Sequence, residues 1–446
     1  GSTNYKPVSL LLLGGRLIDP AKGIDETGSL LISEGKISWL GRGETAPLQQ
    51  DYDVIYAQGL VVCPGFIDLH CHLRQPGFEE KETIATGTQA AARGGFTTIC
   101  CMPNTNPPLD NPNAIDYVKS VAAREGVVSV LPIGCVSKGR KGEELANMHE
   151  LASAGVIGYS DDGLPVKTFN LMRQALEYSC ASGLPIIDHC EDTALTEGGV
   201  MNEDIISTKL GLHGMPAAAE ESIVARDLAL AKQTGGRLHI AHVSTEGSVE
   251  LIRRAKSEGI KVTAEVTPHH LTLTEESVID YDTNTKVNPP LRTKRDIQAL
   301  IRGLKDGTID IIATDHAPHT EADKQCEFAI APFGISGFET ALGSLMALVH
   351  AGQLSLNALI ARLTCEPSRI IGDRYGRLGT LAAGAPADIT LFDPEKEWVV
   401  DTAAFASKGK NTPLAGAVLK GKVMATIFEG KLIYKDESIR LSKGVL

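Results

Sequence analysis

The sequence predicts an α/β fold, a (β/α)8 barrel with a small β-sandwich domain formed by both chain ends. Three observations support this prediction. Short apolar runs alternate with amphipathic segments through the middle of the chain, strand-like runs without helical periodicity occupy both ends, and polar residues gather where the central strands end. At 446 residues, the chain is long enough for a barrel with an appended domain.

The two chain ends consist of short strand-like runs separated by Gly, Asp and Asn. The expected strands cover residues 9–13, 15–17, 29–32, 36–40 and 54–57, and then 388–392, 398–400, 422–428 and 431–434, with a hairpin turn at 429–430. Neither set is large enough to bury a core alone. We therefore expect residues 1–63 and 376–446 to form one β-sandwich beside a barrel of residues 64–375.

Eight short runs rich in Val and Ile fit parallel strands that are buried on both faces. They cover residues 66–70, 97–102, 127–132, 156–160, 185–188, 238–242, 261–266 and 310–314. Helical segments separate them, including residues 115–124, 169–179, 222–232, 249–256 and 296–304. Eight such units favour a closed barrel over an open doubly wound sheet, and no G-x-G-x-x-G dinucleotide fingerprint follows any strand.

The first central strand ends in two histidines, His70 and His72, followed by Arg74. Side chains at positions i and i+2 of a strand point to the same face, so the two imidazoles leave the strand side by side. Paired imidazoles are suited to bind one metal ion, whereas the guanidinium is suited to bind a carboxylate. A lone H-x-H could also be a hydrophilic strand end.

Other strands also end in polar residues, which places them on the barrel rim that carries active sites. These residues are Asn104, Asp161, Asp162, His189, His242, Asp315, His316 and His319. Four histidines and two carboxylates exceed the needs of one tetrahedral zinc ion and predict two ions that share a bridging carboxylate and hydroxide. Asp315 would both bind a metal and accept the proton of the attacking water.

The alternatives for these residues are structural. One of Asp161 and Asp162 is expected to cap a turn before Gly163, and strand alternation does not decide which. His189 and His242 could be core histidines with satisfied hydrogen bonds. His239 lies nearer the barrel middle and is assigned a structural role.

Composition excludes several classes of partner. A net charge of −12 argues against nucleic acid and anionic membranes, and no apolar run is long enough to span a bilayer. Nine cysteines without regular spacing indicate a reducing, cytoplasmic location. The expected ligand is a small molecule.

With these motifs in view, nearly the whole chain resembles the amidohydrolase superfamily and, within it, the bacterial type I dihydroorotases. Residues 68–74 (DLHCHLR) and 313–319 (ATDHAPH) resemble the two family signatures. Further similar blocks are 102–105 (MPNT), 241–244 (AHVS), 267–270 (TPHH) and 287–291 (VNPPL).

The resemblance implies a ligand set for one or two Zn²⁺ ions per chain. His70, His72 and Asp315 would hold the first ion, and His189 and His242 the second. Many relatives bridge the ions with a carboxylated lysine, but residues 158–163 read GYSDDG and contain no lysine. Similarity to an aspartate-bearing branch points to Asp162 as the bridge.

The resemblance also implies a reaction, the reversible cyclisation of N-carbamoyl-L-aspartate to L-dihydroorotate in de novo pyrimidine biosynthesis. A metal-bridged hydroxide would attack the ring amide, and Asp315 would carry the proton. Arg74 would hold the substrate carboxylate with Asn104 and His319, while Asn288 and the backbone at Phe333 and Gly334 would contact the ring. Residues 271–292 could be a mobile lid or an ordinary surface loop.

Two rival functions remain open. An allantoinase or hydantoinase shares these motifs, but its substrates lack the carboxylate that Arg74 is suited to bind. A non-catalytic scaffold for aspartate transcarbamoylase should have lost metal ligands, whereas all six positions are filled here. We expect a homodimer, and docking of aspartate transcarbamoylase to an active enzyme stays open.

Overall fold

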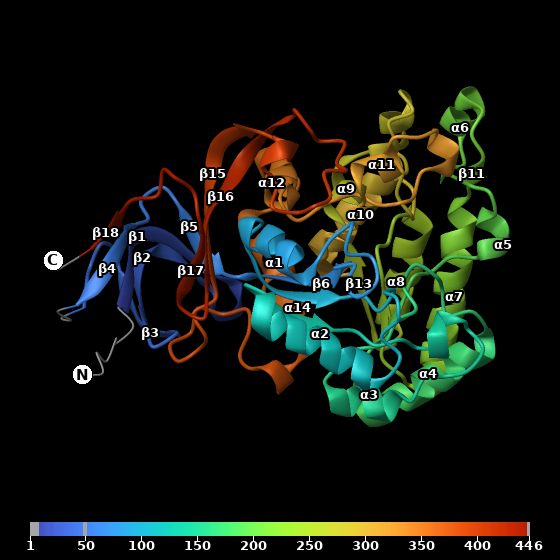
Figure 1. Ribbon diagram of the computed structural model, residues 1–446, viewed down its shortest axis with the longest axis horizontal. Coiled ribbons are helices and arrows are strands. Elements are labelled where there is room, and N and C mark those ends of the chain that lie inside the picture. Colours follow the sequence, from blue (N-terminus) through green and yellow to red (C-terminus); the bar gives the residue numbers. More distant parts are fainter. Residues whose placement is uncertain (1–8, 48–50, 444–446) are drawn as a thin grey trace.

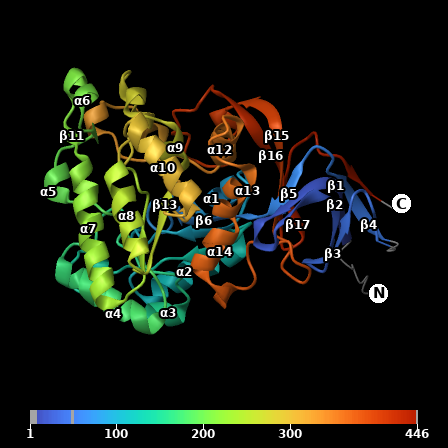
Figure 2. The same cartoon turned by 180° about the vertical axis from the view of Figure 1, so that it is seen from behind.

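The computed structural model describes residues 9–47 and 51–443; the outermost parts of the predicted sandwich, at 1–8 and 444–446, lie outside the described residues. As predicted, the fold is mixed α/β with a separate β-sheet region (Figure 1). The opposite view shows helices along the outside of the larger region (Figure 2). Among the described residues, no helix is long and apolar enough to cross a membrane.

Both chain ends contribute to one connected nine-stranded sheet. Its hydrogen-bonded order is β17-β16-β15-β5-β1-β2-β3, with β4 pairing β1 and β18. The strands are β1 (Ser9–Asp19), β2 (Ile24–Ser33), β3 (Lys36–Arg42), β4 (Tyr52–Tyr56), β5 (Val61–Pro64), β15 (Ile389–Val399), β16 (Val418–Phe428), β17 (Lys431–Lys435) and β18 (Leu441–Ser442). The two ends join where β5 pairs antiparallel with β15, and one core contains Leu12, Ile32, Leu391 and Ile427.

Several strands of this sheet differ from the prediction. Residues 9–13 and 15–17 form one strand that continues through an irregularity between Leu12 and Gly15. The predicted strands 388–392 and 398–400 likewise fall in the single strand β15, except for residues 388 and 400, which lie just outside it. Strand β5 was not predicted, because its four residues run directly through Gly65 into the next strand.

The larger region contains two parallel sheets, β6-β7-β8 and β14-β13-β12-β9. Their strands are β6 (Phe66–Cys71), β7 (Phe96–Cys101), β8 (Ser129–Pro132), β9 (Ile186–Asp188), β12 (Leu238–Ile240), β13 (Val262–Val266) and β14 (Ile311–Ile312). A further pair, β10 (Met201–Asn202) and β11 (Gly214–Met215), lies outside them.

The prediction of a strand at 156–160 was wrong in detail, because only Tyr159 forms β-bridges there, one to Gly134 and one to Ile186. The chain enters a turn at Asp161, where Leu164 N donates to Asp161 O, so no longer ladder of β-bridges forms with the neighbouring strands. This short contact nevertheless joins the edges of the two sheets. At their other edges, Cys71 bridges His316.

Helices follow most strands and cover the outside of the larger region. They are α1 (Ile84–Arg93), α2 (Pro112–Glu125), α3 (Met148–Ala154), α4 (Phe169–Ser182), α5 (Thr193–Thr196), α6 (Ile205–Leu210), α7 (Ala217–Thr234), α8 (Glu246–Ser257), α9 (Pro268–Thr272), α10 (Lys294–Asp306), α11 (Glu321–Lys324), α12 (Ala341–His350), α13 (Leu356–Leu363) and α14 (Cys365–Ile371). Helices α2 and α10 begin a few residues earlier than predicted, because a capping residue fixes the first turn of each. Asn111 accepts a hydrogen bond from Ala114 N, and Thr293 forms a capping box with Asp296.

Side chains from the strands of the two parallel sheets pack against one another. Ile67 and Leu69 of β6 share one buried cluster with Cys100, Leu131 and Ile187 from other strands. The interior is therefore packed, and the strand ends form a surface on which polar side chains meet.

Candidate active site

Each predicted ligand lies at or just beyond the carboxyl end of a parallel segment. His70 is in β6 and His72 follows it, His189 directly follows β9, and Asp315 follows β14. His242 and Asp315 have φ values of 26° and 49°, which non-glycine residues rarely adopt and which occur often at functional sites. The chain leaves the strands here in a conformation that brings these side chains together.

The first group of predicted ligands consists of two histidines and Asp315. His72 Nε2 lies 3.0 Å and His70 Nε2 3.2 Å from Asp315 Oδ1. The second group is a histidine pair, in which His189 Nδ1 lies 2.9 Å from His242 Nε2. All five side chains are buried.

Asp162 lies between these two groups. Its Oδ2 is 3.2 Å from His70 Nε2, and its Oδ1 is 3.7 Å from both His189 Nδ1 and His242 Nε2. Asp161 instead accepts hydrogen bonds from Val136 N, Ser137 N and Ser137 Oγ. Asp162 therefore faces both histidine groups, whereas the Asp161 carboxylate is bound by Val136 and Ser137.

The cluster fits divalent cations. Among the described side chains, Asp162 Oδ1 is one of the few buried polar atoms without a hydrogen-bond partner, and it faces ring nitrogens of His189 and His242. Burial would raise the pKa of Asp315, but His70 and His72 outweigh burial and hold that pKa well below its usual range. Burial would lower the pKa of His70, but Asp162, Glu265 and Asp315 raise it well above its usual range. A cation bound among these groups would replace the proton that the raised pKa keeps on the His70 ring.

The substrate-binding candidates lie beside this cluster around a cavity of about 360 Å³. The cavity is lined by His72, Arg74, Asn104, Asp162, Gly163, His189, His242, Val287, Asn288, Asp315, Ala317, Pro332, Phe333 and Gly334. His319 lies behind Arg74, with its Nε2 3.4 Å from an Arg74 nitrogen and 2.7 Å from Phe333 O. Most of the predicted site residues therefore meet at one cavity.

Arg74 is half-buried and faces this cavity. Its Nε donates to Pro318 O at 3.1 Å, and burial lowers its pKa to about 10, so it stays charged at neutral pH. Gly334 has a φ of 147°, and a Cβ there would lie 2.7 Å from Ala317 O. Only glycine lets the backbone pass this closely along the cavity wall.

Hydrogen bonds tie residues 271–292 to one another and to a neighbouring segment. Glu275 N donates to Arg292 O at 2.7 Å, and Lys286 Nζ donates to Phe328 O at 3.0 Å. The segment contributes Asn288 to the cavity.

Sequence reasoning missed two carboxylates beside the ligands. Glu265 Oε2 lies 2.8 Å from His70 Nδ1, and Glu191 Oε1 lies 2.7 Å from His189 Nε2. Burial opposes ionisation of both, but the neighbouring histidines lower each pKa to about 2. A charged residue inside the apolar strand β13 was the available signal for Glu265.

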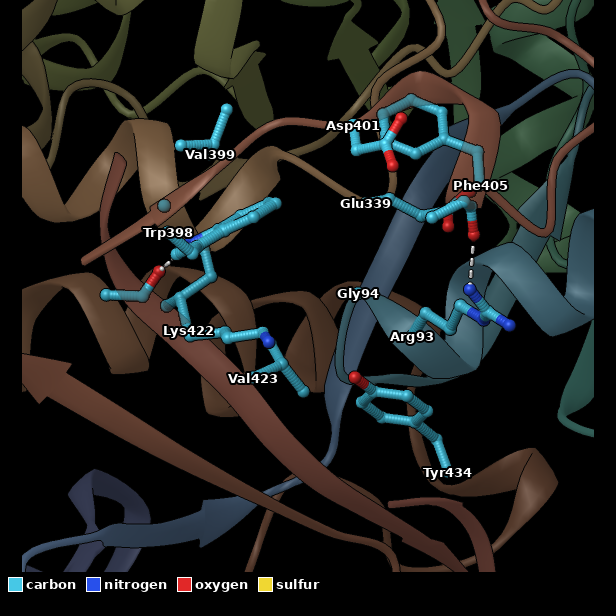
Figure 3. Close-up of a pocket in the computed structure, with 14 residues that line it drawn as sticks. Arg93, Gly94, Glu339, Trp398, Val399, Asp401, Phe405, Lys422, Val423 and Tyr434 are labelled. Atoms are coloured by element: carbon cyan, nitrogen blue, oxygen red, sulfur yellow. Dashed lines mark hydrogen bonds between the residues drawn. The ribbon is translucent and has the colours of Figure 1, made fainter. Parts of the chain in front are cut away.

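A second cavity, of about 210 Å³, lies at the seam between α1, α12 and strands β15–β17 (Figure 3). Its charged side chains already have partners in the protein. Arg93 donates to Ala404 O at 2.5 Å, Glu339 accepts from Ala406 N at 3.0 Å and Ser407 N at 3.1 Å, and Lys422 lies 2.8 Å from Asp436. The seam therefore lacks the convergence of ligand atoms seen at the strand ends.

Comparisons with known proteins agree with the geometry of the strand ends. A family model described as dihydro-orotase-like matches residues 59–248. The dihydroorotase of Thermoanaerobacter sp. (strain X514) is 53% identical over 96% of this chain and 98% of its own length, and that of Pelotomaculum thermopropionicum is 52% identical over 97% and 100%. The solved structure of L-hydantoinase (dihydropyrimidinase) from Arthrobacter aurescens aligns with a TM-score of 0.86 and 25% identity over 98% of both chains. These matches confirm the resemblance to dihydroorotases: the chain belongs to the dihydroorotase family.

Proposed function

We propose that this chain is a metal-dependent dihydroorotase that interconverts N-carbamoyl-L-aspartate and L-dihydroorotate in pyrimidine biosynthesis. One observation carries the proposal: four imidazoles and two carboxylates converge beside the Arg74 guanidinium at a single cavity. Relatives about half identical over nearly the full length are named dihydroorotase.

The proposal includes a closed (β/α)8 barrel of residues 64–375, with residues 1–63 and 376–446 as the two parts of a β-sandwich. Two contacts support closure. Asp315 N donates to His70 O at 2.9 Å at one junction of the parallel sheets, and Ile187 N donates to Tyr159 O at 2.8 Å at the other. A closed ring would gather all the strand ends on one rim.

His70, His72 and Asp315 would hold one cation, His189 and His242 a second, and Asp162 would bridge them. Imidazole and carboxylate ligands suit Zn²⁺, which is our choice, with one or two ions per chain. When bound, such cations lower the pKa of a coordinated water and polarise the amide carbonyl of the substrate.

Asp315 is the proposed proton carrier. It would accept the proton of the attacking water as the new C–O bond forms, and pass it to the ring nitrogen as the C–N bond breaks. The reverse sequence closes the ring. Asp315 Oδ1 lies 3.2 and 3.0 Å from His70 Nε2 and His72 Nε2, which keeps the carboxylate beside the proposed cation.

Arg74 is the proposed partner of the substrate carboxylate, with Asn104 and His319 beside it. Asn104 Oδ1 faces His72 Nδ1 at 2.8 Å, so the Nδ2 group of Asn104 is left to donate a hydrogen bond to the substrate. Asn288 and the backbone at Phe333 and Gly334 would contact the polar edge of the ring. Hydantoins and allantoin lack this carboxylate, so the Arg74 guanidinium at the cavity favours dihydroorotate.

Turnover of the zinc-supplemented protein with dihydroorotate, allantoin and dihydrouracil tests the proposal. Activity confined to dihydroorotate is the expected result. Faster turnover of either other substrate would overturn the substrate assignment. Absence of all turnover, repeated with aspartate transcarbamoylase present, would favour the scaffold interpretation.

The homodimer, the contact with aspartate transcarbamoylase and the cytoplasmic location stay predictions from the sequence. Size-exclusion chromatography of the protein alone and mixed with aspartate transcarbamoylase tests the first two.

A further inference from the structure

Two ligand histidines have their outward ring nitrogen directed at a carboxylate. His70 Nδ1 faces Glu265 Oε2 at 2.8 Å, and His189 Nε2 faces Glu191 Oε1 at 2.7 Å. An ionised carboxylate only accepts hydrogen bonds, so each of these ring nitrogens carries the proton. With a cation bound, the remaining nitrogen, Nε2 of His70 and Nδ1 of His189, would direct its lone pair into the ligand cluster.

Glu265 is fully buried and bound on both oxygens. Its Oε1 lies 2.9 Å from His239 Nε2, and His239 Nδ1 lies 2.7 Å from Thr263 Oγ1. Among the described residues that line the cavity at the strand ends, neither Glu265 nor His239 occurs. Glu265 therefore contacts the ligand cluster but not the substrate cavity.

Glu191 differs because it connects a ligand to the cavity wall. Its Oε1 also accepts from Asn288 Nδ2 at 2.7 Å, and its Oε2 accepts from Thr196 Oγ1 at 2.6 Å. Asn288 lines the cavity. A change at Glu191 should therefore disturb both a ligand histidine and a residue that faces the substrate.

We propose that Glu265 and Glu191 are positioning residues, each serving a different metal position. Glu265 fixes the tautomer and ring orientation of His70. Glu191 fixes those of His189 and also holds Asn288 against the substrate. The inference rests on the proposed function for the identity of the two metal positions. It adds that the metal affinity of each position depends on its own carboxylate.

The test measures zinc affinity by competition with a chelator, starting from metal-free protein. Glu265→Gln and Glu191→Gln preserve side-chain size but remove the negative charge. They also replace a group that only accepts hydrogen bonds with one that can also donate them. Each should weaken one zinc site about 10- to 100-fold. In a His242→Ala background, which removes the second position, Glu265→Gln should still weaken the remaining site and Glu191→Gln should not.

Glu275→Gln is the matched control. Glu275 is another buried carboxylate, and it accepts from Asn202 Nδ2 at 2.7 Å, a residue outside the ligand cluster. This variant should bind zinc as the unmodified protein does. At saturating zinc, Glu191→Gln should also raise the KM for dihydroorotate, whereas Glu265→Gln should leave it unchanged.

Unchanged zinc affinity in both variants, or equal effects of both in the His242→Ala background, would overturn the inference. A second measurement needs no variant at these carboxylates: in zinc-loaded protein labelled with ¹⁵N-histidine, NMR should show the proton on Nδ1 of His70 and on Nε2 of His189. The opposite pattern would refute the assignment. Failure of the unmodified protein to bind zinc would instead count against the proposed function.

Discussion

The cavity at the strand ends and the cavity at the seam contain similar charged side chains, but these are organised in opposite ways. At the strand ends, histidines hold the pKa of Asp315 well below its usual range, whereas at the seam burial raises the pKa of Glu339 to about 7. The first cavity directs ligand atoms at one another, and the second pairs its charges with neighbouring backbone or side chains. Convergence of incompletely partnered groups, rather than cavity size, distinguishes the candidate active site.

Asp315→Ala should have the largest effect, because it removes both a ligand and the proton carrier. We expect kcat to fall by about 10³-fold or more, in line with the loss of a general base and a ligand together. Steady-state turnover of dihydroorotate measures the loss, and a thermal unfolding curve checks that the protein is folded. Full retention of activity in the folded variant would refute the mechanism.

The adjacent carboxylates allow a sharper test within the same cavity. Asp162→Asn should reduce the zinc bound per chain, as measured by elemental analysis after dialysis, because one bridging ligand loses its charge. Asp161→Asn should keep its zinc but lose roughly 1–3 kcal/mol of stability, since an amide cannot accept all the bonds from Val136 and Ser137. The reverse pattern would exchange the two roles.

Arg74→Ala should chiefly weaken substrate binding. Loss of a charged hydrogen-bonding group is worth roughly 1.5–3 kcal/mol, so we expect KM to rise about 10- to 100-fold with a smaller change in kcat. Arg93→Ala is the matched control, because it removes the same side chain from the seam and should leave KM unchanged. An unchanged KM in Arg74→Ala would reject Arg74 as the carboxylate partner.

The sequence predicted those features that depend on local patterns. Apolar runs located most central strands, and spacing placed His70 and His72 on one face. Local pattern could not separate Asp161 from Asp162, because the choice depends on N–H groups about 25 positions earlier in the chain.

The same limit explains what was missed. Glu265 has its role only because His70, which lies 195 positions away, is its neighbour in the folded chain. The seam is likewise formed by residues from distant parts of the chain, such as Arg93, Glu339 and Lys422. Such contacts depend on the packing of whole elements, which no single stretch of sequence specifies.

Glu339→Gln should have the smallest effect on activity, because Glu339 lines the cavity at the seam and not the one at the strand ends. The folded pKa of Glu339, about 7, exceeds the unfolded value of roughly 4.3, so between these values the folded state holds a proton that the unfolded state has lost. Stability should fall as pH rises through this window, by up to about 3 kcal/mol from this group.

Replacing the carboxylate should remove that part of the pH dependence. We expect the difference in melting temperature between Glu339→Gln and the unmodified protein to grow in favour of the variant from pH 5 to pH 8. Arg93 and Lys410 attract the Glu339 carboxylate and so oppose the rise in its pKa that burial causes. This attraction is strongest at low salt, so the change in melting temperature with pH should be smaller there. The kcat and KM for dihydroorotate should stay unchanged. A changed kcat/KM would mean that the seam communicates with the strand ends, and the two cavities could no longer be treated as independent.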